Sequence, residues 1–232
     1  MKYPTLKNTP IKETVFSISY DELIDDAGFE KFVELKEIQE RFPVRNTSMS
    51  LKISAGKTPE IFHQKNGYHL KNENEVVHLR KGSLSYHYLN KYNDFETMVS
   101  GALKFWNIFI KIIDIKLTIN SVSVRYINEI DIDDENQESR IVQIYPKHSS
   151  DREIENFQHF VSFRYNNQKD CLVNIASTKP AQDKVLLDIT VQNERKKDTE
   201  NTIEELFNPL RDIKNRAFFD SITAQALVRY IN

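Results

Sequence analysis

The chain has 232 residues, of which 39% are hydrophobic and 28% are charged, and its formal net charge is -2. This length and composition argue against a low-complexity or loop-dominated protein and predict a globular fold with a sizeable core. Because the charges nearly cancel, no overall field draws the chain to nucleic acid or to an anionic membrane.

The compartment is indicated by what the sequence lacks. Cys171 is the single cysteine, which excludes an internal disulfide and any cluster of thiolate ligands. Residues 3–10 are polar and interrupted by proline, unlike a signal peptide. No apolar run approaches the roughly 20 residues that span a bilayer. We therefore expect a cytoplasmic protein with no membrane partner.

The first third of the chain predicts a strand, a helix and then several short strands. Apolar and polar residues alternate over residues 13–20, and helical spacing follows from Gly28 to Arg41, where Pro43 ends the helix. From Met49 to Leu89, short β segments are separated by residue pairs that contain glycine. Asn66-Gly67 and Lys81-Gly82 each predict a hairpin turn.

Residues 93–113 predict the strongest helix. Asn93 and Glu96 have the spacing of a capping box. A wide apolar stripe follows at steps of three and four, which suits a helix that covers a sheet. The stripe consists of Phe95, Met98, Val99, Ala102, Phe105, Trp106, Phe109, Ile112 and Ile113. We expect Trp106 to be largely buried.

The segment from Ser121 to Ile132 predicts a long strand with one buried face. Val122, Val124 and Tyr126 alternate with polar residues. Asn128 has the same parity as the valines. We therefore expect its amide to bond main-chain groups of a neighbouring strand or of the acidic connector that follows.

The last third predicts three more strands and a helical end. The strands span residues 157–165, 170–178 and 184–193. A short helix is expected over residues 201–207, and a second helix is expected to begin at Asn208 and Pro209 as N-cap and first-turn proline.

Strands in runs, rather than in strict alternation with helices, indicate an α+β fold. We predict a mainly antiparallel, curved β-sheet with long helices packed on one face. One domain covers residues 1–232, with residues 1–113 and 114–232 as loosely similar halves.

Motifs for catalysis or metal binding are incomplete. Ala55-Gly-Lys-Thr58 lacks the earlier glycine of a phosphate-binding loop, because Leu51 stands there. The histidines form no helical ligand pair, although His78 and His87 could face each other across a hairpin. The acidic run over residues 131–138 lacks the glycine and final glutamate of a calcium loop. We therefore predict no metal site, no cofactor and no catalytic residues.

Three residues remain as candidates for binding a ligand or partner: Arg125, Asn128 and Asp188. Arg125 and Asp188 lie on the polar faces of otherwise apolar strands, where opposite charges commonly pair. A structural ion pair is the favoured interpretation, and a ligand site is the alternative.

The order of these landmarks resembles a sporadically distributed family of bacterial proteins of unassigned function. The most specific block is Arg125-Tyr-Ile-Asn128, and Lys12 departs from the apolar residue usual in the family. The looser similarities are Pro10-Ile-Lys-Glu13, Tyr88-Leu-Asn-Lys-Tyr92, Trp106, Leu187-Asp-Ile189 and Phe219-Asp-Ser-Ile-Thr223. The resemblance implies one α+β domain and a place among mobile or defence-related genes.

These observations predict a non-enzymatic interaction or regulatory protein, an accessory subunit of a bacterial defence or toxin–antitoxin-like system. Its partner would be another protein, and self-association is left open. The alternative is a small-ligand-binding protein with a cavity between helices and sheet. A hydrolase or nuclease ranks third, because no acid–base constellation is present.

Overall fold

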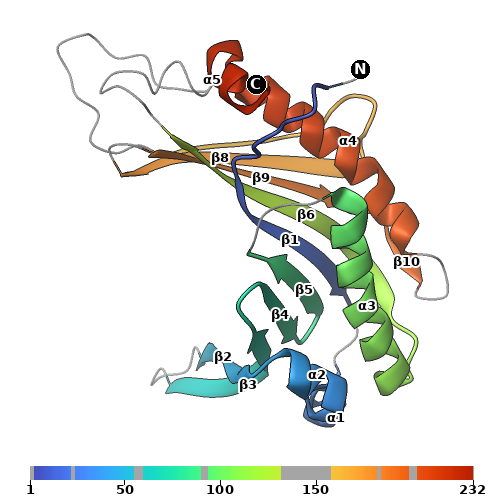
Figure 1. Ribbon diagram of the computed structural model, residues 1–232. Coiled ribbons are helices and arrows are strands. Elements are labelled where there is room, and N and C mark those ends of the chain that lie inside the picture. The colour runs from blue at the N-terminus through green and yellow to red at the C-terminus, as the bar shows by residue number, and fades with distance from the viewer. Residues whose placement is uncertain are drawn as a thin grey trace.

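The computed structural model describes residues 3–21, 24–54, 60–89, 94–131, 158–181, 184–198 and 203–231. Its strands pair antiparallel in the order β2-β3-β4-β5-β1-β6-β9-β8-β7, and β10 pairs with β6 (Figure 1). The strands are β1 (Ile11–Tyr20), β2 (Val44–Ser54), β3 (Glu60–Lys71), β4 (Glu75–Arg80), β5 (Ser83–Tyr88), β6 (Thr118–Asp131), β7 (Gln158–Phe163), β8 (Cys171–Ala181), β9 (Lys184–Asn193) and β10 (Lys197–Asp198). The helices are α1 (Asp26–Glu34), α2 (Lys36–Arg41), α3 (Phe95–Ile113), α4 (Glu204–Ser221) and α5 (Ala224–Ile231). The predicted α+β class with an antiparallel sheet is confirmed.

The first strand of the chain lies in the middle of the sheet. Phe16 on β1 pairs with Tyr86 on β5 on one side and with Val124 on β6 on the other. The early strands β2–β5 therefore extend the sheet in one direction from β1. The late strands β6–β9 extend it in the other.

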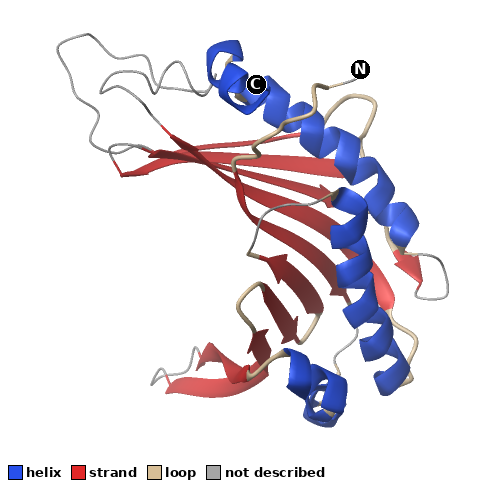
Figure 2. Ribbon diagram, in the orientation of Figure 1, coloured by secondary structure: helices blue, strands red, loops and turns tan. Residues whose placement is uncertain are grey.

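The helices cover one face of this sheet (Figure 2). Phe16, Tyr126 and Ile189 from three neighbouring strands are buried on that face. α3 contributes Trp106, which is 3% exposed and lies 5.8 Å from the Tyr20 ring, centroid to centroid. The predicted burial of Trp106 is confirmed.

The predictions for the first helix and for the long central helix need correction. The predicted helix over residues 28–41 is two helices that break at Leu35, which has an extended ψ of 133°. In one straight helix Ile38 would point about 140° away from Val33. The break lets both side chains reach the core. For the long helix, the N-cap is Asp94, which accepts from Thr97 N, and Asn93 lies outside the described residues.

The C-terminal helix also differs from its prediction. α4 is one helix from Glu204 to Ser221 and passes through Pro209, so no new helix begins at Asn208. Proline removes one backbone donor from the helix. The buried side chains of Phe207 and Leu210 on either side of it continue one apolar stripe. Packing of that stripe on the sheet holds the helix together across the proline.

The two predicted hairpin turns have different outcomes. Lys81-Gly82 joins β4 to β5 as predicted, with Gly82 at φ 86°. Asn66-Gly67 is not a turn but lies inside β3, beside a register shift in the pairing with β2. A Cβ on Gly67 would come within 1.9 Å of the Leu79 carbonyl oxygen. Gly67 therefore lies at a bulge, where the absence of a side chain lets the neighbouring strand β4 approach closely.

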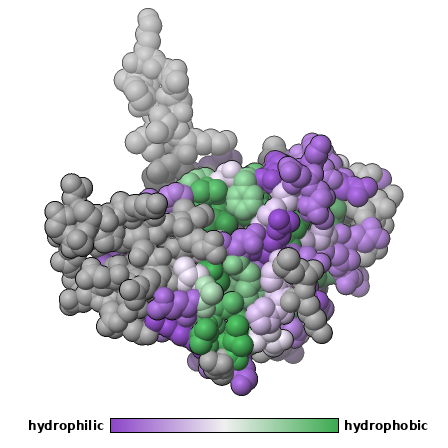
Figure 3. Space-filling model, turned by 90° about the horizontal axis from the view of Figure 1, so that it is seen from above, coloured by the Kyte–Doolittle hydropathy of each residue, from purple (hydrophilic) through white to green (hydrophobic). Residues whose placement is uncertain are grey.

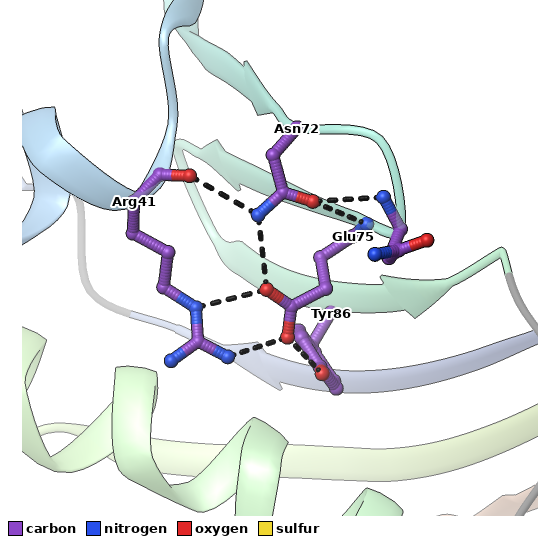
Figure 4. A network of polar contacts seen from close by, with 5 residues as sticks. Arg41, Asn72, Glu75 and Tyr86 are labelled. Atoms are coloured by element: carbon purple, nitrogen blue, oxygen red, sulfur yellow. Dashed lines mark hydrogen bonds and ion pairs between the residues drawn. The ribbon is translucent and has the colours of Figure 1, made fainter.

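A polar network fastens α2 to the early strands (Figure 4). Glu75 accepts from Arg41 Nε at 2.9 Å and Arg41 Nη2 at 2.5 Å. It also accepts from the Tyr86 hydroxyl at 2.6 Å and from the Asn72 amide at 3.1 Å. Burial alone would raise the pKa of Glu75, but these donors lower it overall. The network therefore holds a buried, ionised carboxylate.

Candidate ligand-binding site

A pocket of about 440 Å³ opens between the sheet, α4 and the N-terminal segment, residues 3–11. β6 contributes Tyr126 and Asn128, β9 contributes Ile189, and α4 contributes Lys214 and Phe218. The pocket is thus built from segments far apart in the sequence, and β6 lies beside β9 in the sheet. Its volume is within the usual range for small-molecule sites.

Lys214 is the buried cation of this pocket. The residue is only 8% exposed, and its Nζ lies 4.2 Å from the centroid of the Tyr126 ring. Burial, helped by the positive charge of Arg211, lowers the pKa of Lys214 to about 8. At pH 7 roughly a tenth of Lys214 is therefore uncharged, and the rest is ammonium.

Asn128 supplies an amide to the lining of the same pocket. Its Nδ2 donates to the carbonyl oxygens of Leu187 at 2.9 Å and Tyr126 at 3.2 Å. The predicted bond to a neighbouring strand is confirmed. No described residue donates to Asn128 Oδ1, so this oxygen is an acceptor available to a molecule in the pocket.

The rest of the lining combines apolar walls with exposed charges. Ile189 and Phe218 are buried, and Phe219 is half-buried. Asp94 and Asp212 also line the pocket and are exposed. An apolar body with one polar end would therefore match the buried part of the pocket better than a fully polar solute.

The N-terminal segment forms one wall and runs beside α4 (Figure 1). The Tyr3 ring stacks on Phe219 with centroids 4.6 Å apart. Lys7 N donates to the carbonyl of Tyr230 at 2.8 Å, and Glu129 N donates to the Pro10 carbonyl at 2.8 Å. This end of the molecule, seen from above, shows hydrophobic surface in its middle and a hydrophilic region to the right (Figure 3).

Arg125 and Asp188 lie on the opposite face of the sheet from Asn128. Arg125 Nε donates to Asp188 Oδ1 at 2.9 Å, and Nη2 donates to Oδ2 at 2.5 Å. The predicted pairing of the two charges is confirmed. The structure does not unite the three candidate residues, because alternate residues of β6 point to opposite faces.

The sheet face that carries Arg125 and Asp188 also carries a row of histidines that crosses β3, β4 and β5. The ring centroids of His69 and His78 are 4.5 Å apart, and those of His78 and His87 are 4.6 Å apart. His87 Nδ1 lies 2.7 Å from Glu13 Oε1. Sequence reasoning found the approach of His78 and His87 but missed His69. In the described part of the chain, no three His, Cys, Asp or Glu side chains are placed to hold a metal ion.

Lys214 was also missed by the sequence reasoning, although the signal for it was present. Leu210 and Phe218 belong to the buried stripe of α4, and Lys214 lies four residues from each of them. A lysine in register with an apolar stripe is expected to be buried. Its contact with Tyr126 required the tertiary structure.

Several predicted features lie outside the described residues. They are the Ala55–Thr58 segment and the acidic connector after Asp131. The helix predicted to begin at Asn201 is described only from Ile203 onward.

Comparison with known proteins gives no assignment: no family model matches the chain, and no curated protein matches it. The resemblance to the bacterial family described above therefore stays a prediction. Among helices of the described residues, none is both long enough and apolar enough to cross a membrane.

Proposed function

We propose that this protein binds a small organic ligand in the pocket between β6, α4 and the N-terminal segment. The observation that carries the proposal is the placement of a buried ammonium group, Lys214, and an amide oxygen, Asn128 Oδ1, on one partly apolar lining. Convergent polar groups in an apolar recess are typical of ligand sites.

The chemistry of the lining describes the ligand. Lys214 would donate to an oxygen of the ligand, and Asn128 Oδ1 would accept from a hydroxyl or amide hydrogen. Phe218 and Ile189 would contact a ring or short chain. Small organic acids and carbonyl compounds with an apolar body fit this pattern.

The experiment is a ligand screen with matched lysine variants. Small organic acids, amides and carbonyl compounds are tested by ligand-observed NMR, and hits are titrated calorimetrically. Lys214→Met removes the buried cation, and Lys111→Met is the control because Lys111 is exposed on α3. We expect saturable binding to wild type and Lys111→Met, weakened at least about tenfold in Lys214→Met, which corresponds to one lost charge-assisted hydrogen bond. Equal binding to all three proteins would contradict the proposal.

The sheet face that carries Arg125 and Asp188 supports a second candidate function, docking of another protein. Here Arg125 on β6, whose side chain is 45% exposed, pairs with Asp188 on β9. The Glu13–His87 pair joins β1 and β5 on the same face. Asp188 engages Nε and Nη2 and holds the guanidinium in place, so its remaining Nη1 edge would meet a carboxylate or planar amide of a partner at low entropic cost. The resemblance described above suggests that such a partner would belong to a defence-related system.

Arg125→Ala and Arg125→Lys separate docking from a purely structural pair. If the pair is structural, alanine lowers the free energy of unfolding and lysine restores part of it. If the surface recognises a partner, both variants fold normally and lose a partner that wild type retains in affinity purification from the native host. If both variants fold normally and retain every wild-type partner, docking through Arg125 is contradicted.

A further inference from the structure

We propose that Lys214 is the nucleophile of the pocket and binds aldehyde or ketone ligands covalently, as an imine between its Nζ and their carbonyl carbon. This inference rests on the proposed function, because it names the class of ligand that the same pocket takes. It goes beyond that function by assigning a bond-forming role to one atom.

The geometry around Nζ is the first support. Lys214 projects from α4 onto the Tyr126 ring at 4.2 Å, and the residue is 8% exposed. A carbonyl ligand in the 440 Å³ pocket would therefore meet an amine that side chains largely screen from bulk water. Limited access of water slows hydrolysis of an imine once it has formed.

The electrostatics around Nζ are the second support. Arg211 lies one helical turn before Lys214 and lines the same pocket. A lysine that is desolvated and lies near another cation is activated as a nucleophile, because both effects disfavour its protonated form. With a pKa of about 8, roughly a tenth of Lys214 is uncharged at pH 7. An ordinary exposed lysine has only about 0.03% in that form.

The reaction needs no cofactor and no change of oxidation state. The neutral amine attacks the carbonyl carbon and forms a carbinolamine. The carbonyl oxygen then leaves as water, and a carbon–nitrogen double bond remains. Starting from the ammonium form, the products are one protonated imine and one water, so atoms and charge balance. The apolar walls, including Phe218 and Ile189, would hold the body of the ligand.

Reductive trapping tests the inference on the full chain. The protein is incubated with 4-formylbenzoate or with acetone, each with cyanoborohydride, over a pH series from 6 to 9, and modified lysines are quantified by peptide mass spectrometry. Lys214→Arg keeps the charge but removes the amine. Lys111→Arg is the matched control on an exposed site. A parallel titration with 4-methylbenzoate, which has no carbonyl carbon able to form an imine, measures non-covalent binding alone.

We expect Lys214 to be modified at least tenfold faster than any exposed lysine at pH 7, with a rate that levels off above about pH 8. Total modification should fall in Lys214→Arg and stay unchanged in Lys111→Arg. If Lys214 reacts no faster than exposed lysines with either compound, the inference is overturned. Saturable binding of 4-methylbenzoate would in that case leave the proposed ligand pocket standing. Selective modification without any saturable non-covalent ligand would support the nucleophile and count against the broader binding function.

Discussion

Asn128 illustrates how one buried polar side chain is tied to main-chain groups. Its amide hydrogens both go to carbonyl oxygens, those of Tyr126 and Leu187. Replacement by leucine would leave these acceptors without that donor inside the core. We expect Asn128→Leu to lower the free energy of unfolding by about 1–3 kcal/mol. Urea denaturation measures the change.

An exposed asparagine provides the comparison for this substitution. Asn107 lies on the solvent side of α3, so Asn107→Leu should change stability by less than about 0.5 kcal/mol. Equal effects of the two substitutions would show that the hydrogen bonds of Asn128 contribute nothing specific.

His78 makes stability depend on pH. It lies between His69 on β3 and His87 on β5, and Arg80 Nη2 lies 3.4 Å from its Nδ1. Burial, together with these neighbouring histidines, lowers the pKa of His78 to about 4. Glu13 adds a negative charge beside His87, but burial outweighs it, and the pKa of His87 is lowered as well.

The direction of the pH effect follows from these lowered values. An unfolded histidine titrates near pH 6.5, so between pH 6.5 and 4 the unfolded chain binds more protons than the folded chain. The contribution of His78 to the free energy of unfolding is therefore fully present above about pH 6.5 and is lost as the pH falls toward 4. We expect His78→Gln to reduce this decline in urea denaturation at pH 7.5, 5.5 and 4.5. His159→Gln on the distant edge strand β7 should not, and an identical pH profile for both variants would contradict the assignment.

At the scale of elements, the Glu75 network joins α2 to β4 and β5. Glu75 is 8% exposed and receives donors from Arg41, Asn72 and Tyr86. Glu75→Gln keeps the shape but replaces charge-assisted bonds with weaker ones and presents an amide group to Arg41. We expect a loss of about 1–3 kcal/mol in the free energy of unfolding.

The same substitution on the exposed surface of α2 is the control. Glu40 pairs with Lys36 at 3.7 Å, and their side chains are 67% and 89% exposed. Glu40→Gln should therefore cost less than about 0.5 kcal/mol. Thermal unfolding of both variants measures the difference, and comparable losses would mean that burial adds nothing to the Glu75 network.

At the scale of the whole molecule, the central position of β1 links the two halves of the chain. β1 belongs to residues 1–113 but pairs with β6 along most of its length, from Ile11↔Asn128 to Tyr20↔Ile119. Separating the chain after residue 113 would expose the edges along which β1 and β6 pair. We expect neither half to unfold cooperatively by itself. Circular dichroism and near-ultraviolet melting of the separate halves test this, and a cooperative transition in either half would support loosely independent units.

The sequence was sufficient where local periodicity decides structure. Alternation over residues 121–132 predicted β6 and the inward placement of Asn128, and the stripe of α3 predicted the burial of Trp106. It was insufficient where local signals compete with packing. Asn66-Gly67 has the preferences of a turn, but the approach of Leu79 from the next strand places Gly67 in a bulge.

By itself, the sequence determined the α+β class, the antiparallel strands, the Lys81-Gly82 hairpin and the polar-face positions of Arg125 and Asp188, because alternation and turn chemistry act over a few residues. Only the tertiary structure decided that β1 is central, that the helix over residues 28–41 is broken, and that Lys214 meets Tyr126. These features depend on contacts between residues distant in the chain. The free energy of such contacts comes from burial that no local pattern records. The candidate site is of this kind, because its lining comes from both ends of the chain and from the middle of the sheet.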